Sequence, residues 1–349
     1  MSDEFRELLK KVGSGTHTSK SLTRQEAYQA TIMMFQEKAT PAQMGAFMIA
    51  HRIKRPTPEE LAGILDAYDE FAAKLTVKDL GGAYAPVIFG NPYDGRSRTV
   101  PVTVVTALIL AAVGMPVILH GGDRMPTKYG IPLVEIWQGL GIDFSGFSLA
   151  EAQSFLENTG IGFVYLPQHF PQANNLVPYR EQIGKRPPFA TLELIWSPVV
   201  EKIASVSGFV HPPTEERFRK TFELRGVKNY TTVKGLEGSC DLSRNRTGII
   251  GMSDEVNGWR QFMLHPRDFG LQGRDVALES EAQAIAQIQG AIAGKNQELI
   301  PNVILNGGFY LWLLGVCSSL EAGFTLAESM IIEGEIQDKL NQLIDNYSS

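Results

Sequence analysis

The sequence is poor in cysteine and has no long uninterrupted apolar segment. Its 349 residues include only two cysteines, Cys240 and Cys317, which do not form a CxxC motif. We therefore expect neither a disulfide framework nor a structural zinc site, as in a protein of the reducing cytoplasm. No segment approaches about 18 consecutive apolar residues, and the amino-terminal MSDEFRELLKK lacks the apolar centre of a signal peptide. The sequence thus predicts a cytoplasmic protein without a membrane partner.

An excess of positive charge is also missing. Lysine and arginine number 32 against 38 aspartates and glutamates, which gives a formal net charge of −6. This balance argues against a surface that covers a polyanion, although it is compatible with a local basic pocket. Apolar residues make up 44% of the chain and charged residues 20%, as in soluble globular proteins. A chain of this length usually forms more than one domain, and we expect two.

The first 76 residues carry three helix-start signals of one type. In each, a threonine can accept a hydrogen bond from the first turn, and a Glu or Gln three positions later can bond back to the backbone. Pro41 and Pro58 stand at first helical positions, where a missing N–H costs nothing. The pairs are Thr23 with Glu26, Thr40 with Gln43, and Thr57 with Glu60. We predict an all-helical domain over residues 1–76, whose apolar faces are compatible with a dimer or domain interface.

From about residue 77 the pattern becomes that of an α/β domain. The segment YAPVIFGNPYDGRSRTVPVTVVTALILAAVGMPVILHGG reads as an apolar strand, a polar loop, an apolar helix and a second apolar strand. Strands that are apolar on both faces and separated by a helix are typical of a parallel sheet covered by helices. We predict a larger α/β domain with a central, mostly parallel sheet, formed by residues 77–142 and 198–349. Part of about 143–197 is predicted to pack on the helical domain.

Further elements follow along the chain. Ser148 and Glu151 form a fourth capping pair, and Gly160 ends that predicted helix before the strand GFVYLP. The segments VEKIASVSGFV, NYTTVKGLEG and TGIIGM are additional strand candidates. Towards the carboxyl end we predict helices over 279–294 and 301–322 and a capped helix that begins at Thr325.

Two polar loops follow predicted strands and are candidates for chemistry. They are FGNPYDGRSRTVPVT and HGGDRMPTKYG, and both lie at the carboxyl ends of strands, where α/β proteins bind ligands. Neither has the glycine register of a P-loop or a dinucleotide fingerprint. The alternative is that both are ordinary strand-to-helix turns, in which Gly, Pro and Asp serve backbone geometry. Together they offer a set suited to a phosphorylated ligand: Asp94, Arg96, Arg98, Thr103, Arg124, Thr127 and Lys128.

The motifs in these loops resemble those of the anthranilate phosphoribosyltransferase family, glycosyltransferase family 3 with a nucleoside phosphorylase class II-like fold. GNPYDG is similar to the family's diphosphate loop Gly-Thr-Gly-Gly-Asp-Gly. LHGGDRMPTKYG is similar to its Lys-His-Gly-Asn-Arg-Ser followed by Ser-Lys-Ser-Gly, and FVYLPQHFPQANNLVPYREQIGKRPPFATLELIWSP follows further family landmarks. The resemblance covers nearly the whole chain. It implies a small helical domain joined to a larger α/β domain, and phosphoribosyl transfer from phosphoribosyl diphosphate to an aromatic or base-like acceptor, a reaction of tryptophan biosynthesis.

The resemblance assigns roles to residues at matching positions. His120 and Arg180 fall on catalytic positions, His120 between the two substrates and Arg180 at the aromatic acid. Thr103 and Asp241 fall on positions that hold magnesium, so Mg²⁺ is the implied cofactor, and a homodimer is implied as well. We expect Asp94 and Lys128 to share one cationic site. The substrate-binding positions are Gly90, Asp94, Gly95, Gly121, Arg124, Thr127, Lys128 and Gly130.

Several residues depart from the family pattern. Pro92 and Tyr93 replace the paired glycines of the diphosphate loop, which removes an N–H donor and adds bulk. Gly122 replaces an asparagine that contacts the acceptor amine in the family, which argues against anthranilate itself as the acceptor. Cys240 replaces one of two adjacent carboxylates, and a thiol is a poor ligand for magnesium, with Glu237 as a nearby substitute. In the second loop Leu119 stands for a lysine and Asp123 for a basic residue.

The departures leave other interpretations open. The chain resembles a divergent branch of the family whose members look more like nucleic-acid binders, and in this alternative catalysis is lost. The net charge of −6 opposes it. A scaffold or metabolic-sensor role has no positive support in the sequence. His120 is also compatible with a packed histidine, and Arg180 with the solvated face of a helix. The basic residues available to nucleic acid are Arg96, Arg98, Arg124, Arg217, Lys220, Arg244 and Arg246.

Overall fold

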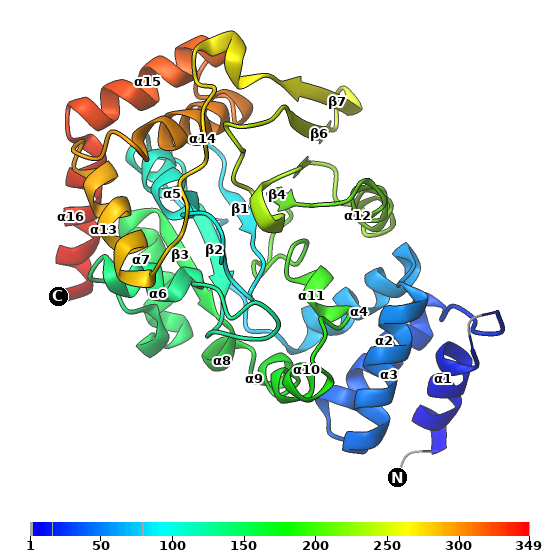
Figure 1. Ribbon diagram of the computed structural model, residues 1–349. Helices are drawn as coiled ribbons and strands as arrows, with labels where there is room; N and C mark the ends of the chain where they lie inside the picture. Colours follow the sequence, from blue (N-terminus) through cyan, green and yellow to red (C-terminus); the bar gives the residue numbers. More distant parts are fainter. Residues whose placement is uncertain (1–2, 16, 79, 349) are drawn as a thin grey trace.

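The protein is described by a computed structural model that covers residues 3–15, 17–78 and 80–348. A small unit of helices adjoins a larger unit in which helices cover a central sheet, and this confirms the predicted fold class (Figure 1). Over the described residues, no helix combines the length and apolar character needed to cross a membrane.

Helices α1 to α4 form the amino-terminal unit, and their predicted starts are confirmed. The side chains of Thr23, Thr40 and Thr57 each accept a hydrogen bond from the backbone N–H three residues later, and the side chain at that later position bonds back. These local signals fix where the helices begin, because they satisfy N–H groups that have no partner within a helix. The helices are α1 Asp3–Gly13, α2 Arg24–Phe35, α3 Pro41–Lys54 and α4 Pro58–Phe71.

A buried carboxylate joins three of these helices. Glu60 is fully buried, and its oxygens accept from Leu22 N and Lys54 Nζ, both at 2.7 Å. His51 Nε2 lies 3.3 Å from the same carboxylate. Burial alone would raise the pKa of Glu60, but His51, Lys54 and the backbone outweigh burial and lower this pKa to about 2. The capping glutamate of α4 therefore also connects α4 to the end of α3 and to the start of α2.

The central sheet has seven strands in the order β3-β2-β1-β4-β5-β6-β7, of which the first five are parallel and the last two antiparallel. The four later strands that were predicted are all present. The strand β7, which forms a hairpin with β6, was not predicted. The bounds are β1 Val87–Gly90, β2 Val117–Gly121, β3 Ile161–Tyr165, β4 Ala204–Gly208, β5 Tyr230–Val233, β6 Gly248–Asp254 and β7 Gly258–Leu264.

Both faces of the parallel strands are buried, as their unbroken apolar sequences predict. Phe89 and Leu119 belong to one apolar cluster, which also contains much of α5 and α14. Ile88 and Ile118, the alternate residues of β1 and β2, belong to a second cluster, which contains the apolar side chains of α2 to α4. The helical unit therefore covers one face of the sheet directly.

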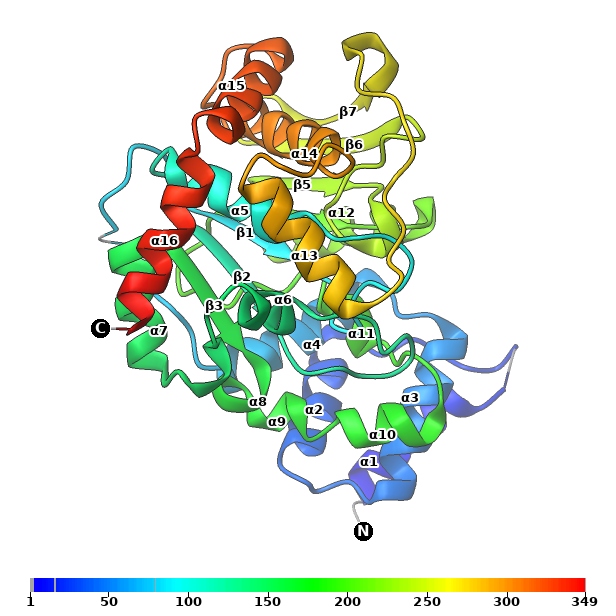
Figure 2. The same cartoon turned by 60° about the vertical axis from the view of Figure 1, so that its left-hand side comes forward.

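Long helices follow the strands. Helices α13 to α16 lie on the far side of the molecule from α1 to α4 (Figures 1 and 2). The capping pair of Ser148 and Glu151 at the start of α7 is confirmed, as is the end of that helix at Gly160. The helices are α5 Thr103–Ala112, α6 Leu133–Gly139, α7 Leu149–Thr159, α12 Pro212–Leu224, α13 Glu281–Ile292, α14 Ile300–Leu313, α15 Leu320–Ile332 and α16 Glu335–Ser348.

The predicted carboxyl-terminal helix boundaries are partly wrong. The helix predicted over 301–322 ends at Leu313, and the next helix begins at Leu320 rather than at Thr325. Ser319 is the N-cap of α15, since its side chain accepts from Ala322 N at 3.2 Å. The apolar pattern continues into the next helix, so the local signs of the boundary are Gly315, which has φ +81° after the end of α14, and the serine cap.

Short helices between β3 and β4 lie against the helical unit. The ring of Phe170 packs on those of Phe35 and Tyr68, with centroids 5.3 and 4.9 Å apart. This contact places part of 143–197 against the helical unit, and the predicted domain division at 76, 142 and 197 stays a prediction. The short elements are α8 Leu166–His169, α9 Pro171–Asn174, α10 Val177–Ile183, α11 Phe189–Leu192, and the 3-10 turns η1 Phe144–Gly146, η2 Leu236–Gly238 and η3 Pro266–Phe269.

Candidate active site

The two predicted loops, at 91–102 after β1 and 122–132 after β2, lie side by side and are joined through their backbones. Arg96 and Ile131 form an antiparallel bridge, with N···O distances of 3.1 and 2.8 Å, and Gly130 N donates to Asp94 O at 2.9 Å. A Cβ atom on Gly95 would lie 2.5 Å from Gly130 O, and Gly95 has φ +71°. The contact between the loops therefore requires glycine at 95 and close backbone approach at 130.

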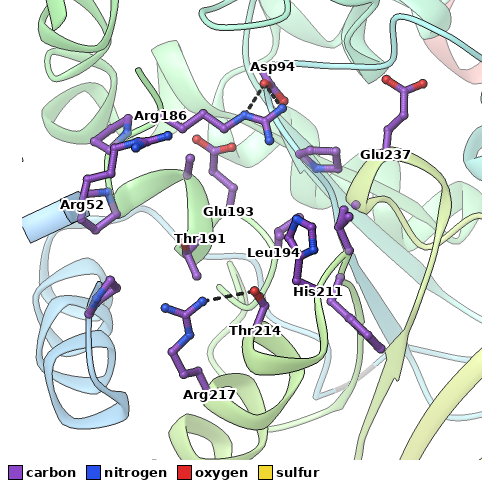
Figure 3. A pocket seen from close by; sticks show the side chains of 18 of the residues that line it. Arg52, Asp94, Arg186, Thr191, Glu193, Leu194, His211, Thr214, Arg217 and Glu237 are labelled. Atoms are coloured by element: carbon purple, nitrogen blue, oxygen red, sulfur yellow. Dashed lines mark hydrogen bonds and ion pairs between the residues drawn. The ribbon is translucent and has the colours of Figure 1, made fainter. Parts of the chain in front are cut away.

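A cavity of about 750 Å³ opens beside these loops (Figure 3). It lies between the end of α3, the α10–α11 segment and the start of α12, so both units of the fold contribute to it. Its cationic lining residues outnumber its carboxylates, and the start of α12 adds the positive end of a helix dipole. The cationic residues are Arg52, Arg55, Arg98, Lys128, Arg180, Arg186 and Arg217, and the acidic ones are Asp94, Glu193 and Glu237.

Asp94 and Lys128 meet in this cavity, as expected. Lys128 Nζ lies 3.5 Å from Asp94 Oδ1, and Arg186 Nε donates to Asp94 Oδ2 at 2.7 Å (Figure 3). Asp94 is buried, so Arg186 and Lys128 together compensate its charge. The buried Lys128 ammonium makes no hydrogen bond within the described residues. Burial lowers the pKa of Lys128, although Asp94 and Glu237 oppose that shift.

Glu237 is a second carboxylate close to Lys128, and it also accepts hydrogen bonds from the backbone of the first loop. Its Oε2 lies 3.5 Å from Lys128 Nζ, and its oxygens accept from Ser97 N at 3.1 Å and Arg98 N at 3.0 Å. Arg96 Nε donates to it at 3.2 Å. Burial alone would raise the pKa of Glu237, but Arg96, Lys128 and these N–H groups outweigh burial and lower the pKa to about 2. The carboxylate is therefore ionised at neutral pH.

Tyr93 turns inward from the first loop and engages His120. Its hydroxyl lies 2.5 Å from His120 Nδ1, and its ring and that of Trp196 pack edge-on against the imidazole. His120 is fully buried, and burial lowers its pKa to about 3. The imidazole is therefore neutral at physiological pH and does not line the large cavity. This geometry agrees with the packed-histidine interpretation, and the catalytic role of His120 stays a prediction.

Arg180 is engaged by a carboxylate of the protein itself. Its Nη1 lies 2.5 Å from Glu193 Oε1, and Glu193 Oε2 accepts from Tyr93 N at 3.0 Å. Burial raises the pKa of Glu193, while Arg180 opposes that shift. Beside this pair is a second, apolar cavity of only about 30 Å³. Arg180 lines both cavities, but an aromatic acid does not fit the small one in this conformation.

Thr103 and Asp241 lie together, as the resemblance implies, but their contacts do not fit magnesium. Thr103 Oγ1 donates to Asp241 Oδ1 at 2.8 Å, while Asp241 Oδ2 accepts from Arg96 Nη1 at 2.7 Å and Val102 N at 3.0 Å. An arginine thus compensates the buried carboxylate where a cation would bind. The Cys240 thiol points to Gly90 O, and burial raises its pKa. Among the described residues, no cluster of three or more His, Cys, Asp or Glu side chains could hold a metal ion.

The remaining predicted residues lie apart from the cavity lining. Arg124 is exposed and pairs with Glu135 at 2.8 Å and with Glu281. Thr127 is exposed, and Gly121 ends the buried strand β2. Gly90 packs against the backbone that follows α11, since a Cβ there would lie 2.1 Å from Leu194 O. Their roles in binding substrate stay predictions, and for Gly90 the observed role is packing.

Sequence reasoning missed four of the cavity's charged residues. Arg186 and Glu193 belong to the GKRPPFATLE segment, whose basic residues directly before two prolines were the available signal. Arg52 and Arg55 lie at the end of α3 in the helical unit. No local pattern connects that helix end to loops that follow in the chain, so only the three-dimensional fold brings these residues to the site.

Two protein-family models match the sequence of this chain. The helical bundle domain of a glycosyl transferase family matches residues 6–72, and the α/β domain of the same family matches residues 94–337. The second match alone spans more than half of the chain. The chain belongs to this glycosyl transferase family. The division between the two models falls between the helical unit and the first candidate loop, and the open cavity lies between the matched parts.

Relatives of known function are similar over nearly their whole length. The chain is 27% identical to anthranilate phosphoribosyltransferases from Aromatoleum aromaticum and Burkholderia mallei, over 93% of this chain and 98% and 97% of those proteins. The structure matches an anthranilate phosphoribosyltransferase from Saccharomyces cerevisiae in complex with PRPP and Mg, with a TM-score of 0.84, 17% identity, and coverage of 100% and 99%. The enzyme from Thermus thermophilus matches with a TM-score of 0.79 and 20% identity over the full length of both chains. These structures share its fold.

Proposed function

We propose that this glycosyl transferase is a phosphoribosyltransferase that binds phosphoribosyl diphosphate in the cationic cavity. The observation that carries the proposal is the excess of cations over carboxylates around a cavity at the carboxyl ends of the parallel strands. Its volume of about 750 Å³ lies within the usual range for ligand pockets. A ligand with several phosphate charges matches this lining, and the curated relatives catalyse phosphoribosyl transfer by name.

The proposed chemistry depends on positioning and electrostatics. Transfer breaks the bond between C1 of the ribose and a diphosphate oxygen, and the acceptor nitrogen forms the new bond to C1. The leaving diphosphate gains negative charge as the bond breaks, so fixed cations stabilise that charge more in the transition state than in the ground state. Lys128 is the residue that we assign to this role, because its three N–H groups are unengaged by hydrogen bonds in the buried wall of the cavity.

We propose that the acceptor is an aromatic or base-like molecule that enters through the large cavity. Binding of a carboxylate at Arg180 would require displacement of Glu193 and more space than about 30 Å³. Both requirements weigh against anthranilate. The yeast relative has been described in complex with 4-fluoroanthranilate, so that acceptor belongs in the test.

A homodimer and a cytoplasmic location remain parts of the proposal, and Mg²⁺ is a variable of the binding test below. The yeast relative binds Mg together with PRPP, but Asp241 and Thr103 of this chain do not fit the ion, and no step here is derived through it. The apolar side chain of Ile53, 69% exposed on α3, is compatible with a dimer through the helical unit.

The nucleic-acid alternative has less support from the site. Arg96 is buried in ion pairs with Asp241 and Glu237, and Arg124 and Lys220 pair with glutamates. Four of the seven basic residues named for that alternative thus pair with carboxylates of the protein, and Arg217 lines the large cavity.

Isothermal titration calorimetry with PRPP, with and without Mg²⁺, tests the proposal. We expect binding by the purified chain and a loss of about tenfold or more in Lys128→Gln, since a hydrogen bond to a charged group contributes about 1.5–3 kcal/mol. Lys220→Gln, on the exposed surface of α12, is the matched control and should bind as the parent does. Release of diphosphate is then measured with a panel of anthranilate, other aromatic acids and bases. A chain that binds no PRPP under any of these conditions would refute the assignment.

A further inference from the structure

Among the described residues, three arginines on one side of the large cavity have no anionic partner. Arg52 and Arg55 come from the end of α3, and Arg217 comes from α12. The side chains of Arg52 and Arg55 make no hydrogen bond or ion pair within the described part of the chain. Arg217 bonds only to neutral oxygens of its own helix, Pro213 O and Thr214 Oγ1, both at 3.2 Å. Figure 3 shows Arg52 and Arg217 entering the pocket from different elements.

The electrostatics at Arg217 are unfavourable without a ligand, whereas Arg52 and Arg55 are exposed to solvent. Burial lowers the pKa of the Arg217 guanidinium, and the charge of Arg55 lowers it further. The carboxylates that line the cavity are paired elsewhere: Asp94 with Arg186, Glu193 with Arg180, and Glu237 with Arg96. A bound anion would relieve the repulsion between arginines that face the same space.

The backbone at Arg55 is a second, independent observation. Arg55 has φ +65° and ψ 125°, a conformation that side-chain-bearing residues rarely adopt and that glycine adopts readily. Pro56 follows it directly and restricts its conformation further. Strained residues of this kind persist mainly where the surrounding structure or a function holds them. An arginine at a position suited to glycine, with its guanidinium free at a cavity, fits such a function.

We propose that Arg52, Arg55 and Arg217 form a binding site for a phosphate monoester, distinct from the Lys128 end of the cavity. Arginine suits this ligand because its planar guanidinium donates paired hydrogen bonds to phosphate oxygens. The site recognises one chemistry that has two sources: the 5-phosphate of the sugar donor, or a phosphate carried by the acceptor. The inference rests on the proposed function only in taking the cavity as the substrate site.

Calorimetric titration with five probes tests the site: ribose 5-phosphate, inorganic diphosphate, PRPP, adenosine 5′-monophosphate and adenosine. We expect Arg217→Gln and Arg52→Gln to weaken ribose 5-phosphate or adenosine 5′-monophosphate by about tenfold or more and to leave inorganic diphosphate within about twofold. Arg217→Lys should restore part of the loss. Circular dichroism verifies that each variant is folded, and Lys220→Gln on the same helix is the control.

The pattern of losses identifies the source of the phosphate. A loss for ribose 5-phosphate and PRPP assigns the site to the sugar donor, and a loss for adenosine 5′-monophosphate but not for PRPP assigns it to the acceptor. Unchanged binding of both monoesters in Arg52→Gln and Arg217→Gln overturns the inference, while Lys128-dependent PRPP binding would still support the proposed function. Conversely, binding of a monoester that depends on these arginines, without any binding of PRPP, would support the inferred site and contradict the proposed function. An equal loss in Lys220→Gln, or tighter binding of a single-stranded oligonucleotide than of any monoester, would mark an extended nucleic-acid surface and also overturn it.

Discussion

Replacement of Glu237 by glutamine tests how the wall of the cavity is held together. The side chain is 3% exposed and lies against five other residues, Thr99 among them. One oxygen accepts from Arg96 Nε at 3.2 Å and Arg98 N at 3.0 Å, and the other accepts from Ser97 N at 3.1 Å and lies 3.5 Å from Lys128 Nζ. Glutamine has the same shape but presents an NH₂ group at one oxygen position. The NH₂ group of the glutamine would then face the N–H donors that now bond to that oxygen, and these donors would lose their acceptor in a buried site.

The magnitude follows from the pKa of this carboxylate. Burial raises the pKa of Glu237, but Arg96, Lys128 and the backbone lower it from 4.5 to about 2. A depression of this size corresponds to about 3 kcal/mol of unfolding free energy at pH 7. Because the folded pKa lies below the unfolded one, this stabilisation is complete above about pH 4.5 and is lost as the pH falls towards 2. At pH 3 about 1.5 kcal/mol remains.

Urea unfolding followed by tryptophan fluorescence measures this effect. We expect Glu237→Gln to lower the unfolding free energy by about 3 kcal/mol at pH 7 and by about half as much at pH 3. Glu216→Gln is the control, because Glu216 pairs with Lys220 on the exposed face of α12 and should leave the midpoint unchanged at both pH values. A penalty of the same size at pH 3 and pH 7, or one no larger than that of the control, would refute the electrostatic reasoning.

Three further changes test other parts of the structure. Glu60→Gln should destabilise the helical unit by about 3 kcal/mol at pH 7, and by less as the pH falls from 4.5 to 2, in thermal unfolding followed by circular dichroism. Gly95→Ala should cost about 2 kcal/mol or more in the same assay, because of φ +71° and the contact with Gly130 O, whereas alanine at an exposed helical site would not. Tyr93→Phe should cost about 1–3 kcal/mol in urea unfolding by leaving buried His120 Nδ1 unpaired, and an unchanged midpoint would contradict that hydrogen bond.

The parts of the fold that the sequence predicted are those set by local interactions. Thr23, Thr40, Thr57 and Ser148 start helices because each cap is formed within four residues, so the sequence contains the whole interaction. The buried parallel strands were recognisable because both of their faces are apolar. β7 was missed because its residues are mostly exposed, so neither an apolar run nor clear alternation marks it.

The site was predictable only in part, because its decisive contacts join distant residues. The order of the motifs correctly placed Asp94 near Lys128, since parallel strands end at one edge. It could not show that Arg96 reaches Asp241, 145 residues later, and takes the place of a cation there. The order of the motifs also could not show that Glu193 pairs with Arg180, because no local pattern connects two residues that lie 13 positions apart on different helical segments.

The departures from the family pattern act together in the folded protein. Tyr93, in place of a glycine, fills the space beside His120, and its backbone N–H donates to Glu193, which in turn engages Arg180. The Tyr93 side chain and Glu193 both line the small cavity, which leaves little room there, while the large cavity stays open. Under the proposed function, an acceptor would enter through the large cavity, where α3 and α12 present Arg52, Arg55 and Arg217. An acceptor that carries its own phosphate would use both the open cavity and the monoester site that we propose on that side.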